Sequence, residues 1–138
     1  MAATKAKNIV WDPTEATADD DALFDAWDEA AEEAAIAEAA KLADVPYIII
    51  EGRIFAGRFP DGEILKCPLD FSVADLEAIT ADHDNPVDQV KALLNRLGNE
   101  KTAGALETKD LASVVIYAEK FFNVFNRIAG VALGKSLA

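Results

Sequence analysis

The sequence has little of the chemistry that most enzymes use, with one cysteine, Cys67, and one histidine, His83, among 138 residues. A single cysteine cannot form a disulfide within the chain, which favours a reducing cytoplasm. A Cys–His catalytic pair would need a chance approach of these two side chains, and a zinc site would lack its other usual ligands. We interpret Cys67 as a half-buried structural thiol and His83 as a surface imidazole. We expect no catalytic residue, metal, cofactor or enzymatic activity.

Basic charge is also scarce, because 13 Lys and Arg residues stand against 25 Asp and Glu residues, for a net charge of −12. Nucleic acids and anionic membranes bind basic surfaces, so we expect neither as a partner. No apolar run approaches the roughly 18–20 residues of a membrane-spanning helix. Residues 1–7 lack the apolar segment of a secretory signal. The chain length predicts one domain with a modest core.

A phosphate-binding loop is suggested by residues 129–136, Ala-Gly-Val-Ala-Leu-Gly-Lys-Ser, in which Ala replaces the first Gly of the relaxed pattern. Such a loop requires a buried strand before it and a helix after it, because N–H groups at the helix N-terminus hold the phosphates. Here a helical pattern precedes the segment. We therefore do not expect nucleotide binding.

Acidic residues are concentrated in residues 1–44, which carry a net charge of −9. Residues 1–16 have no periodicity and are predicted to form a flexible tail. A capping box, Thr17-Ala-Asp-Asp20, predicts the start of an acidic, Ala-rich helix over residues 17–44. Its thin apolar stripe, which includes Trp27, predicts weak packing. Two interpretations remain open, a solvated helix face and an acidic arm that binds a basic partner.

A small antiparallel sheet is predicted over residues 46–69. The β-branched run Tyr47–Ile50 is followed by a Glu-Gly turn, and an Asp-Gly turn separates Arg53–Gly57 from Glu63–Cys67. Short strands between Gly-containing turns are typical of a hairpin or a three-stranded meander. Because two or three strands are not stable alone, we expect them to pack on helices.

Three further helices are predicted over about residues 73–81, 86–98 and 109–130. The first follows a second capping box, Ser72-Val-Ala-Asp75, and the next has Pro at its first helical position. The predicted fold class is α+β and mainly α-helical, with four to five helices and a small antiparallel β-hairpin or three-stranded sheet. The core domain is expected over residues 45–138.

The helix expected over residues 109–130 has an unusually wide apolar face. Its apolar arc covers about 180°, against roughly 100° for a stripe that faces a core. We interpret one edge of this face as core and the other as a partner surface. The candidate partner-binding residues are Phe121, Phe122, Val124, Phe125 and Ile128, with Trp27 as a second anchor.

Three segments carry a family resemblance. They are Tyr-Ile-Ile-Ile-Glu-Gly-Arg (47–53) leading to Cys-Pro-Leu-Asp-Phe-Ser-Val-Ala-Asp-Leu (67–76), Asn-Pro-Val-Asp-Gln-Val-Lys-Ala-Leu-Leu (85–94), and Tyr-Ala-Glu-Lys-Phe-Phe-Asn-Val-Phe (117–125). In these segments, residues 47–138 resemble the tail assembly chaperones of long-tailed bacteriophages, especially those of actinobacterial hosts. None of the three motifs is catalytic.

The resemblance implies a non-enzymatic holdase that binds and solubilises the tape-measure protein during tail assembly. Such a protein acts in the host bacterial cytoplasm and is absent from the mature virion. The resemblance also implies a longer second form made by programmed ribosomal frameshifting, and Gly134-Lys135 is where a slippery GGN-AAR codon run would lie. We further expect a homo-oligomer, since self-association would cover the Phe-rich face when no client is bound.

Two other functions stay open. One is a structural virion component of the head–tail connector or tail-terminator type, which would be found in purified particles. The other is an acidic inhibitor that mimics nucleic acid, which would need the carboxylates of residues 1–44 on a rigid surface.

Overall fold

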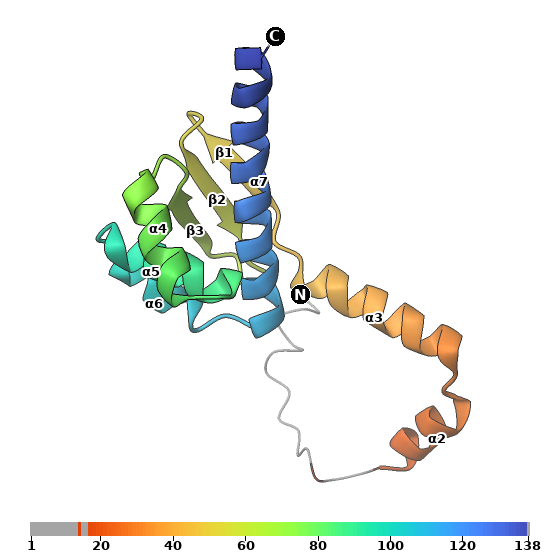
Figure 1. Ribbon diagram of the computed structural model, residues 1–138. Helices are drawn as coiled ribbons and strands as arrows, with labels where there is room; N and C mark the ends of the chain where they lie inside the picture. Colours follow the sequence, from red (N-terminus) through yellow and green to blue (C-terminus); the bar gives the residue numbers. More distant parts are fainter. Residues whose placement is uncertain (1–13, 15–16, 138) are drawn as a thin grey trace. The chain divides into compact units, whose positions relative to one another are not determined.

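The computed structural model describes residue 14 and residues 17–137, with only the backbone for residues 132–137. The tail predicted over residues 1–16 therefore lies outside the described residues, apart from Thr14. The chain divides into two compact units, Met1–Glu38 and Ala39–Ala138. Six helices and one three-stranded sheet occupy the described residues (Figure 1). The mainly α-helical α+β fold is thus confirmed, with more helices than the four to five predicted.

The acidic segment forms two helices, α2 (Ala18–Ala26) and α3 (Glu29–Ala43), in place of the single predicted helix. The predicted capping box is confirmed, because the Asp20 N–H donates to Thr17 Oγ1 at 3.2 Å and the Thr17 N–H donates to Asp20 Oδ2 at 2.9 Å. Asp28 explains the break between the helices. Its Oδ1 accepts a hydrogen bond from the Ala31 N–H at 2.8 Å and so caps a new helix. No residue of either helix is buried.

The second unit contains an antiparallel meander of β1 (Tyr47–Ile50), β2 (Ile54–Arg58) and β3 (Ile64–Pro68), in the order β1-β2-β3. Glu51 and Gly52 in the first turn have φ values of 53° and 70°. These two residues lie in a tight turn that the Arg53 N–H closes by donating to the Ile50 carbonyl at 3.0 Å, within the three residues between the register partners Ile50 and Ile54. The three-stranded alternative of the prediction is therefore the correct one.

Side chains alternate between two faces of this sheet. The inner face holds the register partners Phe55 and Cys67, both of them fully buried. The outer face holds the register row Ile48, Ala56 and Lys66. The core of the second unit lies on the inner face of the sheet.

Four helices complete the second unit: α4 (Val73–Asp82), α5 (Pro86–Arg96), α6 (Glu100–Leu106) and α7 (Leu111–Leu137). The capping box before α4 is confirmed, because the Asp75 N–H donates to Ser72 Oγ at 3.1 Å and the Ser72 N–H donates to Asp75 Oδ2 at 3.0 Å. The helix α6 lies within residues 100–107, where the sequence pattern leaves one or two further helical turns open. The helix α7 continues past residue 130, where the prediction ended it.

The helix α7 crosses the inner side of the sheet (Figure 1). Phe55 on β2 meets Tyr117 edge-on, with ring centroids 5.1 Å apart, and the Tyr117 hydroxyl donates to the Leu65 carbonyl at 3.1 Å. A Cβ atom on Gly57 would lie 2.7 Å from Tyr117 Cδ2. The close approach of α7 to the sheet therefore requires glycine at residue 57.

Candidate partner-binding surface

Two lysines fix α7 against the segments that flank the sheet. Lys109 Nζ donates to Asp61 Oδ2 at 2.7 Å and also to Glu63. These hydrogen bonds raise the pKa of Lys109. Lys120 Nζ donates to Asp44 Oδ1 at 2.8 Å, and this hydrogen bond lowers the pKa of Asp44. The Lys120–Asp44 pair is partly exposed and contributes little free energy. The Lys109 side chain is only 7 % exposed and joins the residue stretch just before α7 to the turn between β2 and β3.

Two of the six predicted partner-binding residues, Phe121 and Val124, lie in the core. Their exposed fractions are 0 % and 3 %. The Phe121 ring meets Phe55 edge-on, with the centroids 5.6 Å apart. A partner would reach either side chain only if the second unit opened. Both residues are therefore corrected from the predicted surface to the core, because α7 turns this edge of its apolar face toward the sheet.

Phe122 and Phe125 lie at the rim of the core and are half-buried. Phe125 stacks on Phe71 with ring centroids 4.8 Å apart, and Phe122 meets Phe121 edge-on at 5.1 Å. Each ring thus has part of its surface held by the core and part in solvent. Because the core already holds these two rings in place, their exposed apolar surface needs no ordering before a partner binds.

Ile128 and Val131 extend this apolar surface beyond the core, with exposed fractions of 41 % and 64 %. Side chains three residues apart are neighbours on a helix surface. Phe122, Phe125, Ile128 and Val131 therefore form an i, i+3 series of neighbours that winds about half a turn around α7, and we name this series the α7 ridge. Figure 1 shows the last turns of α7 extending past the end of the sheet. The prediction missed Val131 because it ended the helix at residue 130.

Trp27, the predicted second anchor, belongs to the first unit, where it caps the C-terminal end of α2 and is 49 % exposed. Leu23 and Phe24 on the same helix are also exposed. Because α2 buries no residue, these side chains form a separate apolar surface. The first turn of α2 also carries acidic residues, so this apolar surface lies on an acidic helix.

The buried polar groups of the second unit are poorly suited to nucleophilic chemistry. Burial raises the pKa of the Cys67 thiol and, as the larger of two causes, that of the Tyr117 hydroxyl. A thiol that stays protonated is a weak nucleophile. Cys67 is more deeply buried than the sequence suggested, since its side chain points to the inner face of the sheet.

The residues that the structure describes contain no group of three or more His, Cys, Asp or Glu side chains placed to hold a metal ion. Residues 129–136 belong to α7, so their backbone does not have the form of a phosphate-binding loop. Within the same described part of the chain, none of the helices combines the length and the hydropathy needed to cross a membrane.

Comparison of the chain with protein-family models, with curated proteins and with solved structures gave no match. A function therefore has to be argued from the residues themselves and from the surfaces that they form.

Proposed function

We propose that this chain is a non-enzymatic tail assembly chaperone that binds and solubilises the tape-measure protein of a long-tailed bacteriophage. The observation that carries the proposal is the α7 ridge, an apolar row that begins at rings held by the core and continues into the exposed Ile128 and Val131. Contiguous exposed apolar surface commonly marks a binding site. The family resemblance of residues 47–138 supplies the identity of the client.

The shape of the α7 ridge suits a helical client. A second helix can cross such an i, i+3 ridge obliquely, with its own side chains on either side of neighbouring members such as Ile128 and Val131. Burial of the exposed parts of Ile128 and Val131, which are 41 % and 64 % exposed, would contribute about 1–2 kcal/mol each. Phe122 and Phe125 would add contact at little entropic cost, because the core already restricts their rings.

The net charge of −12 meets a second requirement of a chaperone, since a net charge far from zero keeps a complex with an apolar client dissolved. Trp27 on the acidic helix α2 is the second proposed anchor. Without client, we propose that the α7 ridge mediates homo-oligomerisation. A frameshift at Gly134-Lys135 would leave the ridge unchanged, so the short and long forms would share it.

Co-expression with the tape-measure protein of the same virus tests the proposal. We expect a soluble complex that co-purifies and that light scattering resolves as a defined assembly. Ile128→Asp combined with Val131→Asp should weaken the complex by about two orders of magnitude, because each change removes apolar burial worth about tenfold in affinity or more. Both side chains are exposed, so the variant should remain folded.

Leu111→Asp is the matched control, because Leu111 is an exposed apolar residue at the opposite end of the same helix. It should bind the client normally. A complex that survives Ile128→Asp/Val131→Asp unchanged would contradict the proposed surface. Stoichiometric presence of the chain in purified particles would instead favour a structural virion component. Displacement of nucleic acid from a partner, lost on removal of residues 1–44, would favour the inhibitor.

A further inference from the structure

The outer face of the sheet differs in character from the rest of this acidic protein. The strand positions that point to this face hold apolar side chains and two cations, Arg58 and Lys66, and none of them holds an acidic residue. We name this surface the outer-face patch. Its principal side chains are Ile48, Ile50, Ile54, Ile64, Arg58 and Lys66.

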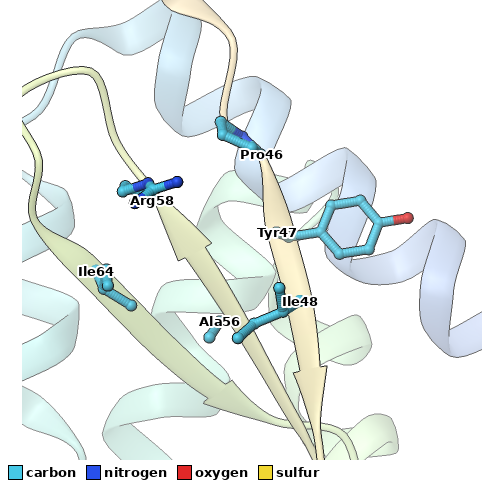
Figure 2. A pocket seen from close by; sticks show the side chains of 6 residues that line it. All are labelled: Pro46, Tyr47, Ile48, Ala56, Arg58 and Ile64. Atoms are coloured by element: carbon cyan, nitrogen blue, oxygen red, sulfur yellow. The ribbon is translucent and has the colours of Figure 1, made fainter.

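The outer-face patch is open to solvent. Ile48 on β1 and Ile64 on β3 are 63 % and 53 % exposed. Between them a shallow hollow of ≈ 170 Å³ lies over Ala56, with Arg58 at its rim. In Figure 2 these side chains lie in front of the strands, and the helices lie behind the sheet.

The two cations of the patch are available. Lys91, Lys109 and Lys120 each form an ion pair with a carboxylate. Arg58 and Lys66 are exposed and form no ion pair with any residue in the described part of the chain. Because Arg58 and Lys66 have no carboxylate partner among the described residues and lie beside open apolar surface, a partner that brings carboxylates would complement them.

We propose that the outer-face patch binds an acidic, amphipathic segment of a partner protein, with apolar side chains over Ala56 and carboxylates on Arg58 and Lys66. Charge complementarity selects this occupant. Two copies of the patch would bring like charges together, which disfavours face-to-face pairing. A nucleic acid would meet two cations in a chain of net charge −12, too few to offset the repulsion. The inference does not depend on the client of the α7 ridge.

Two labelled amphipathic peptides with the same Leu and Phe face test this inference on the full chain. One has Glu at every polar position and the other has Lys. The net charge of −12 alone predicts tighter binding of the Lys peptide, whereas the outer-face patch predicts the Glu peptide. By fluorescence anisotropy at low salt, we expect the Glu peptide to bind at least about tenfold more tightly.

Arg58→Glu combined with Lys66→Glu should abolish the preference for the Glu peptide. Lys101→Glu combined with Arg127→Glu changes the net charge equally at exposed positions elsewhere and should leave the preference intact. Arg58→Gln/Lys66→Gln removes the two positive charges without adding negative ones. Its affinity for the Glu peptide should lie between those of the unchanged chain and Arg58→Glu/Lys66→Glu. Ile128→Asp/Val131→Asp should bind the Glu peptide normally, which separates this inference from the proposed function.

Backbone NMR shifts on addition of the Glu peptide should be largest at Ile48, Ala56 and Ile64. Tighter binding of the Lys peptide would overturn the inference. So would binding of the Glu peptide that is insensitive to Arg58→Glu/Lys66→Glu, or shifts confined to the helices.

Discussion

The apolar face of α7 has two regions with similar side chains and different surroundings. Phe121 and Val124 are enclosed by the sheet and its helices, whereas Ile128 and Val131 are partly exposed to solvent. All four residues belong to one helix, and all are apolar. The difference shows that apolar character alone does not decide burial. The position of the sheet along the helix decides it, and the residues beyond the sheet remain available to a partner.

The largest expected effect is the contrast between these two regions in stability. Phe121→Ala should lower the free energy of unfolding by about 3–5 kcal/mol, because it removes a buried ring and leaves a cavity. Ile128→Ala should cost less than about 1 kcal/mol, since Ile128 is 41 % exposed and lies outside the buried core cluster. Urea unfolding followed by far-UV circular dichroism measures both. Similar losses for the two variants would show that the boundary between core and ridge is misplaced.

Two glycines provide the next contrast. Gly57→Ala should destabilise by about 1–3 kcal/mol, because its new Cβ would collide with Tyr117 and force the packing of α7 to shift. Gly104→Ala in α6 should stabilise by about 0.5–1 kcal/mol, since a Cβ there meets nothing and alanine favours a helix. Thermal unfolding measures whether each variant has a lower or a higher melting temperature than the unchanged protein. A stable Gly57→Ala variant would argue against the close contact of α7 with β2.

The capping box of α4 gives a smaller, pH-dependent effect. The Ser72 backbone N–H, and then Arg96, lower the pKa of Asp75 in the folded state. Stabilisation from this carboxylate is therefore full above its ordinary pKa of about 3.9 and is lost as pH falls through the lower folded value. In Asp75→Asn, the free energy of unfolding should decrease less steeply as pH falls below about 4. Unchanged acid unfolding in Asp75→Asn would contradict the assignment.

The smallest expected effect comes from removing the N-cap side chains of α4 and α2, which form the same kind of capping box in the two units. Ser72→Ala should lower the stability of the second unit by about 1 kcal/mol. Thr17→Ala removes the same kind of cap from α2, which buries no residue. It should reduce helical signal slightly and leave the main unfolding transition unchanged. A shift of that transition in Thr17→Ala would show that α2 is stabilised by packing on the second unit.

Local features of the fold are readable from the sequence, because their causes lie within a few residues. The capping boxes at Thr17 and Ser72 and the turn at Glu51-Gly52 are of this kind. The break at Asp28 has an equally local cause, but the strong helix propensity of the surrounding Ala and Glu residues hid it. The predicted helix ended at about residue 130, yet α7 continues through Gly130, since one glycine costs a helix only about 1 kcal/mol.

The division of α7 into core and ridge is harder to obtain from sequence. A helical projection places Phe121 beside Phe122 in one apolar arc, and only long-range contacts such as Tyr117 with Leu65 show which edge is covered. The outer-face patch was hidden for a related reason. Every residue of β1 is apolar, so the alternation that would separate its two faces is not visible.

The most direct test of the central claim is amide hydrogen exchange of the full chain with and without the tape-measure protein. We expect new protection in residues 122–131 of α7, at and beyond the rim of the core. Residues 111–118, at the covered end of the same helix, should change little. Protection confined to the strands of the sheet, or absent from residues 122–131, would contradict the α7 ridge as the client-binding surface.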